Sequence, residues 1–249
     1  MPFSHYLLIA LAGTGAGFVN TVVGSGTLIT FPTLLSLGYS PLVANVSNTL
    51  GLVPGSASGA YGYRKELQGQ KGRAIRLSLV AIVGGSVGAV LLVLFPGAFQ
   101  QIIPYLVLAA VCLMVVQPKV SAYVTNRKNG KLGTGILYSG VFLTAIYGGY
   151  FGAAQGVVLI ALLAIGIEES LQRLNALKNV LAGVVNGIAA LLFIFITHIA
   201  YGPVFTIAIS SIVGAQIGAR LGRKIPSQVL RGVIVIVGIA VALKLIISG

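Results

Sequence analysis

The chain has 249 residues, of which 57% are hydrophobic and 8% are charged, and its formal net charge is +13. Soluble domains carry about 25% charged residues, so this composition excludes an ordinary soluble protein and predicts an all-α, polytopic membrane protein. The apolar runs do not alternate as the strands of a membrane β-barrel do. The basic residues lie in short clusters between apolar spans, which favours anchoring of loops at the membrane over nucleic-acid binding.

Eight apolar segments follow one another along the chain. They span about 5–37, 41–63, 74–95, 99–117, 133–166, 171–197, 202–221 and 227–247. An α-helix needs roughly 20 apolar residues to cross a bilayer, and most of these segments come close to that length. We therefore expect a multi-pass protein of the plasma membrane, surrounded by lipid.

The sequence repeats itself without gaps at a spacing of 130 residues. The matching positions are Gly26 and Gly156, Asn45 and Asn175, Gly84 and Gly214, Gly88 and Gly218, and Pro96 and Pro226. This pattern predicts one integral membrane domain made of two repeats, 1–117 and 133–249, joined by a cytoplasmic connector over 118–132. The repeated spacing of small residues, Gly84 with Gly88, favours close helix packing over ligand contact.

The two segments that start the repeats, 5–37 and 133–166, are anomalous. Each has about 33 residues, too many for one ordinary crossing, and each is rich in glycine. Glycine breaks a helix at little cost because no Cβ atom restricts its backbone. We therefore expect two helical pieces in each segment, meeting at a non-helical turn that protein or a water-filled cavity surrounds. A re-entrant hairpin and a pair of crossings both fit this pattern.

The positions of the basic residues constrain the topology. If every segment crossed once, the basic loops after 41–63 and 202–221 would face opposite sides, against the positive-inside rule. If 5–37 and 133–166 each enter and leave on one side, fifteen of the sixteen Lys and Arg residues lie inside and only Lys244 lies outside. The second repeat is then inverted relative to the first, as in alternating-access transporters, with about four helical segments in each repeat. Both termini are expected on the outer side.

The glycine-rich turns are the first candidate site. A Gly24-Ser25-Gly26 turn that opens a helix exposes unpaired backbone N–H groups, and the helix dipole adds about half a positive charge there. Such a helix start suits an anion. The equivalent turn in the second repeat ends in Gln155-Gly156, so we expect two helix starts that hold a small anion between them. The alternative interpretation is close packing through small residues.

Polar side chains that follow the turns form the second candidate site. Buried amides and hydroxyls are costly unless they are hydrogen-bonded, and neutral donors hold a transported anion without trapping it. The full set of candidate substrate-binding residues is Asn20, Gly24, Ser25, Gly26, Thr27, Asn48, Thr49, Gln155, Gly156, Asn179 and Asn186. For Asn45 and Asn175, a role in tying the broken backbone together is at least as well supported. For Lys178, extension to the membrane surface is favoured over attraction of anions.

Other kinds of chemistry find little support in the sequence. The chain has no Asp and only three Glu. No cluster of His, Cys and carboxylate residues has the spacing of a metal site, and no nucleophile–base pair indicates an enzyme, so we expect neither a metal nor another cofactor. Glu168 and Glu169 follow the segment 133–166, where they are expected to be solvated or to pair with Arg173.

Four stretches together are similar to a known family. The run 17–32, the turn Gly38–Pro41, the run Ala44–Thr49 and the run 175–183 resemble the TauE/SafE family of membrane transporters, and the resemblance covers nearly the whole chain. It implies export of sulfite, sulfoacetate or related sulfur-containing anions across the prokaryotic plasma membrane. It also implies a site at the Gly24-Ser25-Gly26 turn and the Asn48 region. Many members have more glycine around the turn before Gly156, where Gln155 would then donate in place of a backbone group.

These observations predict a secondary transporter that exports a small sulfur-containing oxyanion by alternating access. A passive anion channel built from the same residues is the alternative. A purely structural scaffold would explain the packing glycines but not the duplicated breaks. The sequence leaves open which anion is carried, the coupling ion and the oligomeric state, a homo-oligomer included.

Overall fold

The computed structural model describes residues 2–126 and 133–222. It also describes some isolated residues and short runs of two or three residues between 232 and 245. Within these residues every regular element is an α-helix, which confirms the predicted all-α class. The helices are α1 (Phe3–Val22), α2 (Thr27–Ser36), α3 (Pro41–Gly62), α4 (Lys71–Leu94), α5 (Pro96–Asn126), α6 (Thr134–Tyr150), α7 (Gln155–Gly166), α8 (Leu171–Ile196) and α9 (Tyr201–Leu221). Residues 127–132 of the expected connector and most of the segment 227–247 lie outside the described residues, together with Arg223, Lys224, Pro226, Arg231 and Lys244.

Five of the described helices are long and apolar enough to cross a membrane: α1, α4, α5, α8 and α9. Their outward faces are apolar as well. Phe195 on α8 is 79% exposed and Ile209 on α9 is 68% exposed. Such side chains are stable facing lipid but not over a large surface facing water. The helices therefore define a multi-pass membrane protein, as the composition predicts.

The helix boundaries follow the predicted segments with two differences of detail. Helix α5 is helical through Asn126, so it runs past Pro118 into the stretch expected to be the connector. The long segments 5–37 and 133–166 each contain two helices, with non-helical residues 23–26 between α1 and α2 and 151–154 between α6 and α7.

The backbone at the two interruptions has the same unusual conformation at equivalent positions. Gly24 has φ = 95°, and Ala154, its counterpart 130 residues later, has φ = 59°. A positive φ ends a right-handed helix, and it is unfavourable for any residue with a Cβ atom. Among the described residues Ala154 is the only non-glycine residue with a positive φ.

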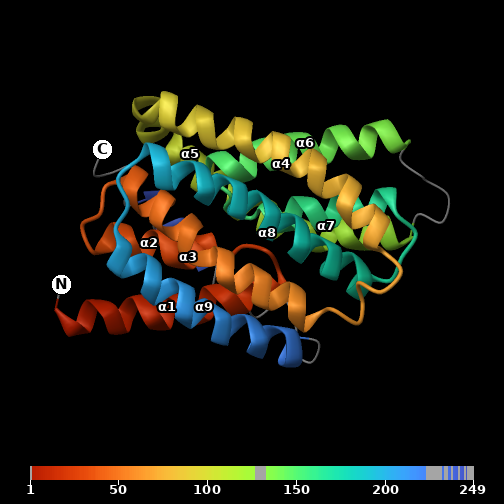
Figure 1. Ribbon diagram of the computed structural model, residues 1–249, viewed down its shortest axis with the longest axis horizontal. Helices are drawn as coiled ribbons and strands as arrows, with labels where there is room; N and C mark the ends of the chain where they lie inside the picture. The colour runs from red at the N-terminus through yellow and green to blue at the C-terminus, as the bar shows by residue number, and fades with distance from the viewer. Residues whose placement is uncertain are drawn as a thin grey trace.

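The first helix of each half packs against a helix of the other half. Helix α1 packs along α9, and its counterpart α6 packs along α4, while α3 and α8 lie against each other in the middle. In Figure 1, α1 begins at one end of the molecule and α6 begins at the opposite end. The repeated glycines make the exchanged contacts. A Cβ atom added at Gly214 would lie 1.9 Å from the Thr14 carbonyl oxygen, and one added at Gly88 would lie 2.0 Å from the Ile146 carbonyl oxygen. These contacts agree with the packing interpretation.

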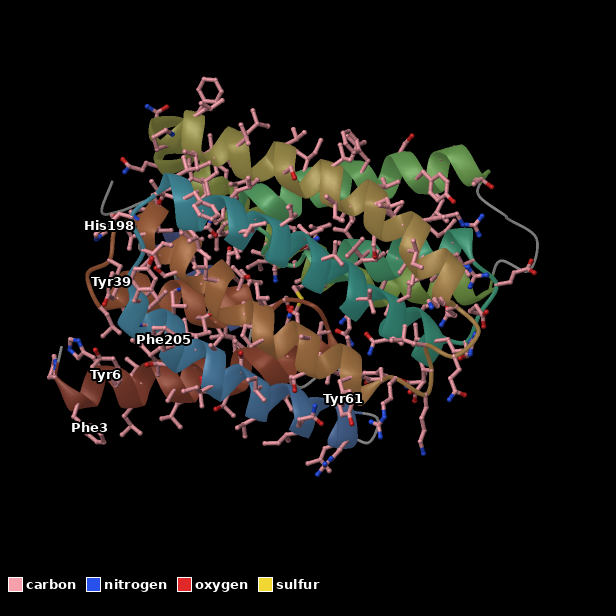
Figure 2. All side chains as sticks on the ribbon, in the orientation of Figure 1. Phe3, Tyr6, Tyr39, Tyr61, His198 and Phe205 are labelled. Carbon is pink, nitrogen blue, oxygen red and sulfur yellow. The ribbon has the colours of Figure 1, made fainter. Side chains whose placement is uncertain are left out.

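The described basic loops gather at one end of the molecule. The Arg73 guanidinium lies 3.3 Å from the Glu169 carboxylate, and Arg173 lies 2.6 Å from the same carboxylate, so the loops before α4 and α8 meet there. The predicted pairing of Glu169 with Arg173 is confirmed. At the same end Arg64 stacks over the ring of Tyr61, 4.5 Å from its centroid. Figure 2 shows Tyr61 far from Phe3, Tyr6, Tyr39 and His198, which lie at the other end.

Candidate functional site

The two helix breaks touch each other in the interior of the protein. The Gly156 N–H donates a hydrogen bond to the Gly24 carbonyl oxygen, with 3.0 Å between nitrogen and oxygen. A Cβ atom added at either glycine would lie 2.5 Å from the Cα atom of the other. Only glycine permits this approach. The contact brings together two turns that are 130 residues apart in the sequence, and it places Gly24, Ser25, Gly26, Gln155 and Gly156 in one region.

Each break carries a buried polar side chain with no partner. Ser25 is 1% exposed and Gln155 is 3% exposed, and they occupy equivalent positions in the two repeats. Within the described part of the chain, neither the Ser25 hydroxyl nor the Gln155 Nε2 atom has a hydrogen-bond partner. Leaving a buried donor unsatisfied costs about 1–3 kcal/mol. Such groups are rare in folded proteins and indicate a place where a ligand or water can bind.

The backbone donors of the two breaks differ. Before α2, the N–H groups of Ser25, Gly26 and Thr27 donate to no acceptor among the described residues, so this helix start offers free amides. Before α7, the Gln155 N–H donates to the Gly152 carbonyl and the Gly156 N–H donates to Gly24. At the start of α7 the Gln155 and Gly156 amides are therefore hydrogen-bonded, unlike the equivalent Ser25 and Gly26 amides before α2. The Gln155 side chain is the unpaired donor on that side.

Asn48 holds the first turn of α2 in place. Its Nδ2 atom donates to the Thr27 hydroxyl at 3.2 Å, and its Oδ1 atom accepts from the Thr30 hydroxyl. All three side chains are buried. Asn48 therefore positions the helix start that carries the free amides, and Thr27 is part of that arrangement. Sequence reasoning did not select Thr30, which lies one turn after Gly26 on the same helix.

Three side chains of α8 close the C-terminal end of α1. The Nδ2 atoms of Asn175 and Asn179 and the Lys178 ammonium each lie 3.2 Å from the Thr21 carbonyl oxygen. The ammonium also donates to the Asn20 carbonyl at 2.9 Å. The last carbonyls of a helix have no partner within it, and they carry about half a negative charge together.

Lys178 is 0% exposed, so the prediction that it extends to the membrane surface is wrong. The carbonyl groups at the end of α1 solvate its ammonium from inside the protein. Lys178 is therefore a residue of the protein interior and not one of the basic loop residues on the inner side, among which the predicted topology counted it.

Asn45, the counterpart of Asn175, closes the end of α6. Its Nδ2 atom donates to the Tyr150 carbonyl at 3.0 Å. The hydrogen bonds of both asparagines thus support the interpretation that they tie the broken backbone together. A further residue supports the second break: the Tyr147 hydroxyl donates to the Ala153 carbonyl at 2.5 Å. No pattern in the sequence selects Tyr147, because its role depends on how the chain turns six residues later.

The side chains of most of the remaining candidates bond to groups outside the two breaks. The Asn20 side chain donates to the Ser56 hydroxyl at 3.2 Å, and the Thr49 hydroxyl donates to the Asn45 carbonyl within its own helix at 2.9 Å. Asn186 is half-buried on α8, and among the described residues no hydrogen bond joins it to either break. Asn179 is engaged at the end of α1, as described above.

Broken helices that meet inside a bundle of apolar helices are typical of a membrane transporter. The family model for "Sulfite exporter TauE/SafE" matches residues 9–245. The chain therefore belongs to the TauE/SafE family, which confirms the resemblance seen in the sequence.

Individual relatives agree in class. "Probable membrane transporter protein YfcA" of Escherichia coli (strain K12) is 27% identical over 234 residues, covering 93% of this chain and 86% of the relative. "Probable membrane transporter protein ORF9" of Sinorhizobium sp is 25% identical over 254 residues, covering 99% and 94%. A "Probable membrane transporter protein" of Haemophilus influenzae is 26% identical over 246 residues, covering 96% and 93%.

Proposed function

We propose that this membrane transporter is a secondary carrier that exports a small oxyanion, sulfite or an organosulfonate, across the plasma membrane. The observation that carries the proposal is the contact between the two helix breaks, with the buried and unpaired donors of Ser25 and Gln155 beside it. The free amides before α2 add a partial positive charge. A site built from N–H and O–H donors binds an anion, and the name of the matching family model favours sulfite.

The charge distribution agrees with an anionic substrate. The chain has no Asp, and its three Glu residues lie in the loops after α3 and before α8. The buried unpaired groups described at or beside the breaks include two donors, the Ser25 hydroxyl and the Gln155 Nε2 atom, and two acceptors, the Oδ1 atoms of Asn45 and Asn175. The free backbone N–H groups before α2 tip this balance toward an anion.

We infer alternating access from the arrangement of the halves. The exchanged pairs α1 with α9 and α6 with α4, and the opposite directions of α1 and α6 in Figure 1, support two inverted repeats. The breaks then lie between the halves, and rocking one half against the other exposes them to one side of the membrane at a time. The basic end is the cytoplasmic end by the positive-inside rule, which places the N-terminal end of α1 outside.

Flux into proteoliposomes tests the proposal. Purified protein should take up radiolabelled sulfite at a saturable rate, and unlabelled sulfite or sulfoacetate on the opposite side should accelerate exchange. Liposomes without protein are the control. Transport of a neutral amine with no movement of sulfite or of a sulfonate would refute the proposal. A current that rises linearly with sulfite concentration and shows no acceleration by exchange would instead establish the passive channel.

A further inference from the structure

We propose that the Lys178 ammonium is the counter-charge of the transported anion and contacts it directly beside the first break. The inference rests on the proposed function and deepens it, because it assigns the charge that selects an anionic substrate over a neutral molecule of the same shape.

Lys178 is a buried basic residue without an anionic partner in the described part of the chain. Its side chain is 0% exposed on α8. The ion pairs of the described residues join Glu169 to Arg73 and Arg173, and none involves Lys178. A buried charge is costly unless it is paired, and an ionisable side chain inside a membrane span usually marks a functional site. A negatively charged substrate would supply the missing partner.

The contacts of the ammonium leave one of its hydrogen-bond donors for that substrate. An ammonium group has three N–H donors, and two of them point to the carbonyl oxygens of Asn20 and Thr21 at 2.9 and 3.2 Å. These carbonyls at the end of α1 offset about half a unit of charge. One donor and about half of the positive charge therefore remain for an anion.

The ammonium and the turn of the first break contact the same part of α1. A Cβ atom added at Gly26 would lie 2.9 Å from the Asn20 Cβ atom and 2.5 Å from the Ala16 carbonyl oxygen. The turn at Gly26 therefore folds back against the same turn of α1 whose Asn20 carbonyl binds Lys178. In this proposal, an anion that accepts hydrogen bonds from the Ser25 and Gly26 amides also accepts one from the ammonium.

A purely structural role for Lys178 as a cap of α1 explains less. The equivalent helix α6 ends at Tyr150, and among the described side chains only the neutral amide of Asn45 donates to that last carbonyl. The residue equivalent to Lys178 in the first repeat is the neutral Asn48, which binds Thr27 and Thr30 instead. Closing a broken helix in this fold therefore does not require a cation.

Calorimetric titration of the purified full-length protein with sulfite tests the inference. Lys178→Met should weaken sulfite binding about 10- to 100-fold, since a hydrogen bond to a charged group is lost, and Lys178→Arg should retain most of the affinity. Lys178→Gln keeps a donor for the Thr21 carbonyl without the charge, so it covers the case in which the methionine variant does not fold. It should bind sulfite as weakly as Lys178→Met does.

Two further readouts separate a counter-charge from a cap. Wild-type protein should bind methanesulfonate more tightly than the uncharged methanesulfonamide, and Lys178→Gln should lose most of that preference. Asn45→Ala removes the equivalent cap at α6, and it should lower the melting temperature with less than a twofold change in sulfite affinity. Wild-type affinity and preference in Lys178→Gln, with only a lower melting temperature, would overturn the inference and leave the proposed function intact. Absence of oxyanion binding and flux in the wild-type protein would instead refute the proposed function.

Discussion

The two helix breaks share a backbone conformation but differ in their hydrogen-bonding groups. Both place a positive φ at the same repeat position, at Gly24 and Ala154, and both bury one unpaired polar side chain. Among the described residues, the Ser25 and Gly26 amides before α2 are free and the Lys178 ammonium binds the end of α1, whereas before α7 the equivalent Gln155 and Gly156 amides are hydrogen-bonded and the Gln155 Nε2 atom is unpaired. The same backbone conformation therefore occurs at both breaks with different hydrogen-bonding groups around it.

The contact between the breaks is the feature on which both halves depend, so its loss should have the largest effect. Gly156→Val would place its Cβ atom 2.5 Å from the Gly24 Cα atom and force the two turns apart. We expect the initial rate of sulfite flux to fall by more than about 100-fold, because misplacing a binding group by about 1 Å can cost that much. Gly187→Val on α8 is the matched control, because a Cβ atom there meets nothing within 4 Å. Equal flux in the two variants would show that the contact is not needed for transport.

A bulky apolar residue at Ser25 should block the first break without disturbing the rest of the fold. Ser25→Leu puts a large apolar side chain beside the free amides and removes the unpaired hydroxyl. We expect sulfite transport to be abolished while the amount of protein in the membrane stays within about twofold of wild type, measured by flux and by quantitative immunoblotting. Asn48→Leu should also abolish transport, because Thr27 and Thr30 lose the amide that holds them. Wild-type flux in Ser25→Leu would remove the first break from the site.

Truncation at the second break should have a smaller effect, because it removes one neutral donor. Gln155→Ala should raise the sulfite dissociation constant about 5- to 10-fold, which corresponds to about 1–1.4 kcal/mol for one hydrogen bond. Thr144→Val is a suitable control, since the Thr144 hydroxyl donates to the Gly140 carbonyl within its own helix at 2.7 Å. If Gln155→Ala raised the sulfite dissociation constant more than Lys178→Met does, the second break would contribute more to sulfite binding than the Lys178 ammonium, against the proposal.

The difference between the breaks also shows what the sequence can and cannot reveal. Segment length and glycine content indicate that 5–37 and 133–166 are unusual, and the 130-residue spacing pairs Ser25 with Gln155 and Asn45 with Asn175. Each of these signals is local or periodic, so it can be read without coordinates.

The hydrogen bond that the Gly156 amide makes and the burial of Lys178 cannot be predicted from such local or periodic signals. Gly156 uses its N–H because it meets Gly24, and Lys178 stays inside because it meets the Asn20 and Thr21 carbonyls. Both facts depend on contacts between residues more than 130 positions apart. A lysine two turns into an apolar helix has the same local pattern whether it reaches the membrane surface or a helix end inside the protein.

The smallest effect is expected outside both breaks, at the ion pairs of the basic end. The hydrogen bond from Arg173, followed by that from Arg73, holds the pKa of Glu169 below its ordinary value of 4.5. A carboxyl group whose pKa is lower in the folded state stabilises the protein above its ordinary pKa, and this stability is lost as the pH falls through the folded pKa. Glu169→Gln should therefore lower the melting temperature slightly at pH 7, in keeping with less than about 1 kcal/mol for exposed ion pairs. The difference from wild type should disappear in acid below the folded pKa. Because Glu169 lies away from the breaks, sulfite affinity should stay unchanged, and a large loss of affinity would mean that the basic end is part of the binding site.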